Sequence, residues 1–357
     1  MKEFTARFAT SAEIDGWDGH VTANPQGGNV LQSKSFAAIK DYTGWKPRFV
    51  ILETPDYSSY NLVLEKTFPV LGRFWYMIKG PDAAAAEDLT GMLRALKTFM
   101  AASNLHVFAI KIEPDIRASA AQHALFTGLG LVKAPIVQTN TNTAILDISD
   151  EPQELLRKLG SRGRHAVRKA IRSNVEVVKA PANDETYRIM YDLMGQVGQG
   201  KANVVLRPFE YYAKFWQLFS DAGQGRMYFV YEGGKPSVGA FVLNYGRKGT
   251  YKDGGSIPAR SQYGDSHLVQ WTAINELKGL GVAEYDFCGT PPSAQLKDES
   301  HPAYGRGLFK TSFTKNVIDW CGPYDLPLSP WRYKVWTKLV ERAMRKLYWR
   351  RTRQPYY

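Results

Sequence analysis

The residue with the clearest chemical potential is Lys310, which directly follows Phe309 at the end of a long polar stretch. Residues 289–308 contain six glycines and prolines, so we expect an irregular loop, and long loops in compact domains are commonly functional. After Lys310 the chain becomes apolar and strand-like. A desolvated ammonium in such a place could hold a phosphate or stabilise a developing oxyanion. The alternative is an ordinary surface lysine beside a strand.

Arg207 and Tyr211 are a second candidate pair, four residues apart. Pro208 at the first turn of a predicted helix would place both side chains on one helical face. A guanidinium beside a phenol suits a phosphate or a carboxylate. A salt bridge with Glu210 or another acid is the alternative for Arg207.

A strongly basic helix is predicted within 151–174. Sixteen of its positions hold seven cations and no acid, namely Arg157, Lys158, Arg162, Arg164, Arg168, Lys169 and Arg172. This density favours binding to a phosphate backbone, with plain solvated surface as the alternative. The predicted C-terminal helix, 331–351, has a second basic face opposite an apolar one.

The elements that must position these residues form two similar halves. A predicted helix over 85–102 runs into an apolar strand at 107–112, and a helix over 268–278 runs into a strand at 282–287. Between them, 227–232, 237–245 and 250–253 predict a three-stranded antiparallel meander. The pattern indicates an α/β (α+β) protein, and 357 residues allow two domains.

Four features in this order resemble the FemABX family of aminoacyl-tRNA-dependent peptidyltransferases. They are the segment Leu31 to Phe36, the basic helix with its following strand, Tyr285-Asp286-Phe287-x-Gly289, and Phe309-Lys310. The family adds amino acids from charged tRNA to the peptide stem of cell-wall precursors. No sustained heptad run is present, so the chain resembles a compact member without a coiled-coil arm.

The resemblance implies a specific fold. We expect two GNAT-like acyltransferase domains, each a mixed twisted sheet flanked by helices. Residues 1–150 would form the first domain, completed by 322–357, and 151–321 the second. The C-terminal helix would return to pack on the first domain.

The resemblance also implies roles for individual residues. Lys310 matches the catalytic lysine of the family, and Phe309 precedes it. Acceptor binding would involve Lys34 and Phe36 near the start, and Arg207, Tyr211, Tyr251 and Asp253 in the second half. Phe36 is equally consistent with a core residue, and Asp253 stands where a second tyrosine is expected. Contacts with tRNA would come from Arg157, Arg164, Arg168, Lys169 and Arg172.

Composition limits the remaining possibilities. The net charge of +12 favours a polyanionic partner such as RNA or a phosphorylated substrate. Two well-separated cysteines, Cys288 and Cys321, suggest neither a disulfide framework nor a zinc site, and the histidines lack metal-ligand spacing. We therefore expect a cytoplasmic protein without a metal. Neither Gly128-Leu129-Gly130 nor Gly279-Leu280-Gly281 keeps a pyrophosphate-binding signature, so acetyl-CoA is not expected as cofactor.

The expected function is transfer of an amino acid from aminoacyl-tRNA to the side-chain amine of the stem peptide of a peptidoglycan precursor. The acceptor could be UDP-linked or lipid-linked, and contact with the inner membrane surface stays open. A monomer is expected. The alternatives are a non-catalytic RNA-binding protein and tRNA-dependent transfer to a small natural product.

Overall fold

The computed structural model describes residues 2–137, 141–197 and 206–352. They form two compact units, the first made of Met1–Thr141 and Trp320–Tyr357 and the second of Asn142–Asp319. The domain boundaries expected from the sequence, at 150 and 321, lie close to these divisions. The first boundary lies earlier than expected, because residues 142–147 form a strand that pairs with strands of the second unit.

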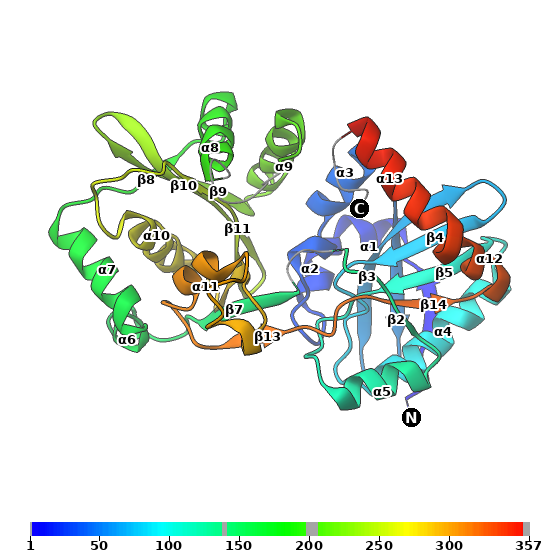
Figure 1. Ribbon diagram of the computed structural model, residues 1–357. Helices are drawn as coiled ribbons and strands as arrows, with labels where there is room; N and C mark the ends of the chain where they lie inside the picture. Colours follow the sequence, from blue (N-terminus) through cyan, green and yellow to red (C-terminus); the bar gives the residue numbers. More distant parts are fainter. Residues whose placement is uncertain (1, 138–140, 198–205, 353–357) are drawn as a thin grey trace. The chain divides into compact units, whose positions relative to one another are not determined.

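The first unit is built on a seven-stranded mixed sheet (Figure 1). In spatial order its strands are β1 (Thr5–Phe8), β2 (Lys46–Glu53), β3 (Ser58–Phe68), β4 (Gly72–Met77), β5 (Val107–Ile112), β14 (Tyr324–Pro327) and β6 (Val132–Lys133). Only the β4–β5 pair is parallel. Helix α4 (Asp88–Ala102) connects these two strands, which is the crossover that parallel pairing requires.

Helices cover both faces of this sheet. Leu89, Met92 and Leu96 of α4 pack with Trp75 and Met77 on one face, together with Phe126. The remaining helical elements are α1 (Ser11–Asp15), α2 (Trp17–Thr22), η1 (Val30–Gln32), α3 (Lys34–Tyr42), α5 (Ala120–Gly128), α12 (Pro330–Val335), the π-helical turn η3 (Trp336–Val340) and α13 (Glu341–Thr352).

The end of the chain completes the first unit. Strand β14 pairs between β5 and β6, and Trp336 is fully buried against Phe68, Phe74 and Phe108. The expected return of the C-terminal segment to the first domain is therefore confirmed. The single helix expected over 331–351 was wrong in detail, because a π-helical turn interrupts it, and Trp336 is the large apolar side chain that reaches the core.

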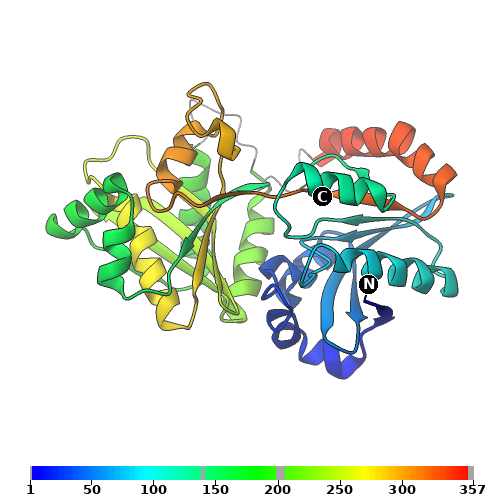
Figure 2. The same ribbon diagram turned by 90° about the horizontal axis from the view of Figure 1, so that it is seen from below.

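The second unit repeats the plan with another seven-stranded mixed sheet (Figures 1 and 2). In spatial order its strands are β13 (Val317–Asp319), β7 (Asn142–Asp147), β12 (Glu284–Gly289), β11 (Lys248–Ser256), β10 (Lys235–Tyr245), β9 (Gly225–Glu232) and β8 (Val178–Ala180). Its helices are α6 (Pro152–Lys158), α7 (Ser161–Arg172), α8 (Asp184–Val197), α9 (Phe209–Asp221), α10 (Asp265–Gly279), η2 (Ser293–Gln295) and α11 (Tyr304–Lys310).

The predicted meander and the following helix and strand are confirmed as β9, β10, β11, α10 and β12. Helices α6, α7 and α10 pack on one face of the sheet, where Val167 and Ile274 join its core, and α8 and α9 pack on the other. The single basic helix expected over 151–174 is instead two helices, α6 and α7. The break at Leu159-Gly160 lets both fold against the same core.

The first sheet contains a fully buried ion pair. Lys111 on β5 lies opposite Asp325 on β14, with 2.7 Å between ammonium and carboxylate, and the Tyr333 hydroxyl donates to the same carboxylate at 3.0 Å. Both charged side chains are essentially inaccessible to solvent. A pair of this kind ties the C-terminal strand to the sheet, because removing one partner leaves an uncompensated buried charge.

We expect Lys111→Met to lower the free energy of unfolding by about 3–5 kcal/mol, because Asp325 would remain buried without its cation. Chemical denaturation measures this change, and Lys97→Met, at an exposed lysine on α4, is the control. The double change Lys111→Met, Asp325→Leu should recover part of the loss. A cost below about 1 kcal/mol for Lys111→Met would show that the pair does not hold β14 in place.

Candidate functional site

The site in the second unit is created where two neighbouring strands separate. Strands β11 and β12 pair in parallel from Lys248 opposite Glu284 to Thr250 opposite Asp286, and the pairing ends there although β11 continues to Ser256. Strand β12 is irregular beyond this point, between Asp286 and Gly289. The separation leaves backbone groups of β12 available to side chains from other elements.

Lys310 lies at this opening. Its ammonium donates a hydrogen bond to the carbonyl oxygen of Gly289 at 2.8 Å and is 5.9 Å from the ring centre of Tyr251. The side chain is only 9% exposed, and this burial lowers the pKa of Lys310 to about 8. The expected loop was wrong at this residue, because Lys310 is the last residue of the short helix α11.

The turn after Lys310 is held by residues that the sequence did not single out. The Ser312 hydroxyl donates to the carbonyl of Phe309 at 2.5 Å and is 3.1 Å from Nε2 of His267 on α10. Ser312 has one hydroxyl proton, which it donates to Phe309. Nε2 of His267 is therefore the protonated ring nitrogen and donates to the Ser312 hydroxyl oxygen. Burial, with the nearby Arg162 and Arg260 cations, lowers the pKa of His267 to about 4, so this histidine is neutral near pH 7.

Phe309 points into packing contacts. Its ring centre lies 4.8 Å from that of His267 and 5.5 Å from that of Phe313, in edge-to-face contact with both. The carbonyl oxygen of Ser312 lies so close to Gly163 of α7 that a methyl group at position 163 would collide with it. Phe309 therefore helps to anchor α11, and the glycine at 163 lets α7 approach the same turn.

A β-bulge separates two residues that the sequence placed together. The register of β11 against β10 shifts between Val242, opposite Tyr251, and Phe241, opposite Asp253. Tyr251 consequently packs on the α10 side of the sheet, whereas Asp253 faces α9. The Tyr251 hydroxyl lies over Gly254, where any larger residue would displace it.

The cluster facing α9 contains Asp253, Lys252, Tyr211 and Arg207. Asp253 is buried and accepts hydrogen bonds from the Trp216 indole and the Lys252 ammonium, both at 3.0 Å. Because two donors already hold this carboxylate, it is poorly placed to act as a free general base. Lys252 is a functional candidate that the sequence analysis missed, since regular strand alternation would have turned it away from Asp253.

Arg207 does not lie on the helix that the sequence predicted for it. Helix α9 begins at Phe209 with Pro208 as its N-cap, so Arg207 precedes the helix. Its guanidinium instead lies over the ring of Tyr211, 4.7 Å from the ring centre. Burial raises the pKa of Tyr211, while the positive charges of Arg207 and Lys252 oppose that rise.

Lys34 and Phe36 lie in the first unit at the start of α3, which Ser33 caps. Lys34 is exposed, and its ammonium is 3.3 Å from the carbonyl of Asp15. Phe36 is 4% exposed, which leaves little surface for a substrate contact. The structure therefore gives Phe36 a packing role and leaves Lys34 accessible.

The predicted tRNA-binding cations differ in how far they are engaged in contacts within the protein. Arg157 is paired with Glu154 at 2.5 Å, and Arg164 donates to the carbonyls of Arg157 and Leu159 at the end of α6. Three others project from α7 as exposed side chains, namely Arg168, Lys169 and Arg172. These three are the better candidates for phosphate contacts.

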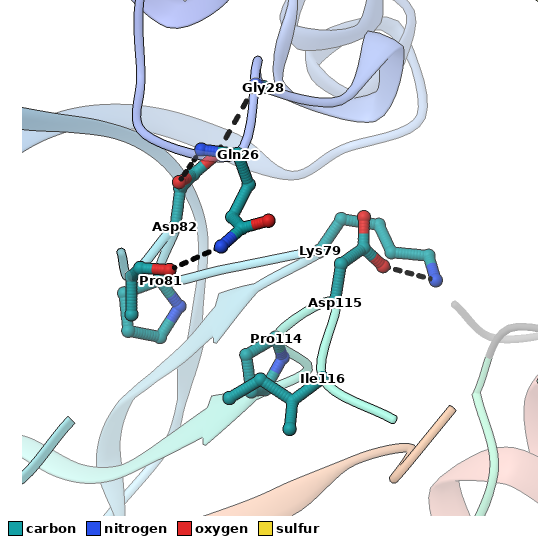
Figure 3. A pocket seen from close by; sticks show the side chains of 9 residues that line it. Gln26, Gly28, Lys79, Pro81, Asp82, Pro114, Asp115 and Ile116 are labelled. Carbon is teal, nitrogen blue, oxygen red and sulfur yellow. Dashed lines mark hydrogen bonds and ion pairs between the residues drawn. The ribbon is translucent and has the colours of Figure 1, made fainter. Parts of the chain in front are cut away.

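The first unit has a small pocket that contains none of the predicted site residues (Figure 3). Its polar groups interact with one another: Lys79 pairs with Asp115 at 2.9 Å, and Asp82 accepts the backbone N–H groups of Gln26 and Gly28. Pro81, Pro114 and Ile116 line the rest. These polar groups of the pocket are therefore already paired with one another within the protein.

The first turn of α10 holds a buried carboxylate. Asp265 occupies its first turn and accepts from the Ser266 N–H at 2.5 Å and from Arg260 at 2.8 Å. A carboxylate there already uses the positive end of the helix dipole. The glycines at 128 and 279 lie at the carboxyl ends of α5 and α10, where the dipole has the opposite sign.

Among the described residues, no group of three or more histidine, cysteine, aspartate or glutamate side chains could hold a metal ion. None of the helices in this part of the chain combines the length and apolar character needed to cross a membrane.

Lys310 should titrate near pH 8, well below its ordinary value of 10.5. Side-chain NMR of lysine-labelled protein should show one resonance with this midpoint, absent from Lys310→Met. Burial disfavours the charged form, so between about pH 8 and 10 the folded state releases this proton before the unfolded state does. The free energy of unfolding should therefore rise over that range relative to Lys310→Met. A midpoint near 10.5 would show that Lys310 is well solvated.

Comparisons with known proteins agree with this architecture. Residues 161–298 match the family described as acetyltransferase (GNAT) domain. The crystal structure of FemX superposes with a TM-score of 0.76 at 19% identity, covering 92% of this chain and 99% of that one. A search of curated proteins gives no match to the sequence.

Two further structures share the fold more loosely. A tandem GNAT protein from the clavulanic acid biosynthesis pathway has a TM-score of 0.51 at 9% identity, covering 92% of this chain and 99% of that one. A conserved protein of unknown function from Bacteroides thetaiotaomicron has a TM-score of 0.51 at 12% identity, covering 91% and 99%. The resemblance to FemABX proteins is thus confirmed at the level of the fold, and the chain is a tandem GNAT-like protein with the architecture of FemX.

Proposed function

We propose that this protein is an acyltransferase that moves an amino acid from aminoacyl-tRNA to the side-chain amine of the stem peptide of a peptidoglycan precursor. The observation that carries this proposal is the buried Lys310 ammonium at the opening between β11 and β12. A FemX-like fold and a GNAT domain support acyl transfer in general. The specific donor and acceptor are inferences from the residues around the opening.

Lys310 would act on the donor. In the proposed reaction, the acceptor amine forms a bond to the ester carbon, and the carbonyl oxygen becomes negative. An ammonium in a site of low dielectric stabilises that charge far better than it would in water. Gly289 accepts one of the three ammonium protons of Lys310, which orients the side chain and leaves two protons for substrate oxygens.

Collapse of the intermediate breaks the bond to the tRNA ribose oxygen, which takes up the proton lost by the amine. Aminolysis of an ester is downhill, so the step needs no nucleotide hydrolysis. The acceptor amine must lose a proton before attack, since its ordinary pKa is about 10.4. Because Asp253 is already hydrogen-bonded to Trp216 and Lys252, we propose that a substrate group supplies the base.

The cluster on the α9 side would bind the acceptor. Arg207 lies over the ring of Tyr211, and a guanidinium beside a phenol suits the phosphate or carboxylate groups of a wall precursor. Lys252, which is paired with Asp253, adds a further polar group to the cluster. Lys34, an exposed cation of the first unit, is proposed separately as a contact for an anionic substrate. Tyr251, on the opposite face beside Lys310, would contact the reacting ester.

Aminoacyl-tRNA is proposed as the donor in place of acetyl-CoA, because Asp265 occupies the start of α10 and α7 offers exposed cations. A protein that only binds RNA would not need a buried lysine with a lowered pKa at a strand opening. We further propose that the protein acts as a monomer on the cytoplasmic side of the membrane.

Lys310→Ala should lose about 2.7–4 kcal/mol of transition-state stabilisation, by analogy with removal of an oxyanion-hole donor. Lys310→Arg should recover only part, because a guanidinium is wider than an ammonium. Purified protein is incubated with charged tRNA and a panel of UDP-linked and lipid-linked precursors, and transfer is followed by mass spectrometry at saturating substrates.

The exposed Lys235 on β10 provides the matched control, Lys235→Ala. Near-normal transfer by a folded Lys310→Ala protein would remove this residue from the mechanism. Transfer only to a small natural product would change the acceptor class, and RNA binding without any transfer would contradict the enzymatic proposal.

Replacing Arg168, Lys169 and Arg172 with alanine should weaken tRNA binding and reduce its salt slope by about 1 for each of these cations that binds a phosphate. The acceptor KM should hardly change. The contrasting variant replaces three exposed cations of α13, Arg342, Lys346 and Arg350. Binding measured across a salt series decides the matter: an unchanged slope in the α7 variant would make that helix ordinary solvated surface.

A further inference from the structure

The C-terminal segment of the first unit, from α12 through α13, has two parallel stripes of opposite character. Both stripes follow the i, i+4 spacing of a helix. The apolar stripe consists of Trp331, Val335, Leu339, Ala343 and Leu347. The basic stripe consists of Lys334, Lys338, Arg342, Lys346 and Arg350.

The apolar stripe lies largely in solvent. Trp331 is 57% exposed, Leu339 67% and Leu347 45%, and Trp349 is a further exposed aromatic on the same helix. The side of the segment that faces the sheet is a different one, which Trp336 and Glu341 occupy as buried residues. Burial of the segment against its own unit therefore does not explain why these large apolar side chains are present.

The charge of the segment is one-sided. Between 330 and 352 the sequence contains eight lysines and arginines and one acid, Glu341, which is buried and approached by Arg345 at 4.0 Å. The exposed charge of the segment is thus entirely positive. An apolar stripe beside a basic one, with tryptophans included, is the pattern of helices that lie in the plane of a membrane interface.

We propose that α12, η3 and α13 form a docking surface for an anionic membrane, with the apolar stripe inserted among the lipid headgroups and the basic stripe against their phosphates. The inference stands independently of the proposed enzymatic function. It would bring the protein to the surface at which lipid-linked substrates are found.

Two other occupants fit the segment less well. RNA would use the cations through phosphate contacts, but it offers no apolar counterpart for a row of exposed leucines along the helix. A second copy of the chain could cover the leucines, but it would oppose two basic stripes of the same sign. An anionic bilayer satisfies both stripes at once.

The test is cosedimentation of the full-length protein with phosphatidylcholine vesicles, with and without phosphatidylglycerol, at low and high salt. The protein should bind the anionic vesicles, and high salt should weaken the binding. Lys338→Gln, Arg342→Gln and Lys346→Gln together should lower binding by about 100-fold, at about fivefold for each cation removed. Leu339→Ser with Leu347→Ser should lower it by at least about tenfold.

Val70→Ser, at an exposed valine of the first unit outside this segment, should bind as the native protein does. The proposal is overturned if the folded native protein does not bind anionic vesicles, or if the leucine variant binds them unchanged. It is also overturned if the basic-stripe variant loses tRNA affinity but keeps its vesicle binding, since the surface would then serve RNA. Transfer to a UDP-linked acceptor, measured in the same variants, should stay normal and so separates this proposal from the enzymatic one.

Discussion

The separation of β11 from β12 is the constraint on which the rest of the second unit depends. Parallel pairing lasts for three residue pairs and then stops at Thr250 and Asp286. Strand β11 carries on with a bulge at Lys252, which turns neighbouring side chains to opposite faces of the sheet. Tyr251 and Lys310 thereby lie together on one face of the sheet, whereas Lys252 and Asp253 lie on the face that α9 covers.

The charges near this opening are held in place by different means. Burial of the Lys310 ammonium, with one carbonyl oxygen as acceptor, carries a desolvation cost. The short helix α11 contains two glycines and is marginally stable on its own. The contacts of Ser312, His267 and Gly163 supply the missing support from α10 and α7. Asp253, in contrast, has both an ion-pair partner and a neutral donor, which makes it part of the framework of the acceptor cluster.

Buried charge has a structural use in the first unit. The Lys111–Asp325 pair crosses from β5 to β14 and joins strands more than two hundred residues apart in the sequence. Asp325 also accepts a hydrogen bond from Tyr333 in α12, the first helix of the C-terminal segment. The outer surface of that segment carries charge of one sign only. The same stretch of chain therefore closes the core on one side and presents an interaction surface on the other.

Local patterns in the sequence were enough to determine the α/β class, the meander, both helix-to-strand transitions and the positions of Lys310, Arg207 and Tyr211 as candidates, because periodicity and spacing are short-range properties. The bulge that separates Tyr251 from Asp253 was not visible, nor was the role of Lys252, since register depends on pairing with a distant strand. The helix at 304–310, the support from His267 and Ser312, and the exposure of Leu339 likewise depend on which faces meet in three dimensions. Only the tertiary structure decides those contacts, because burial is a property of neighbours that the sequence order does not specify.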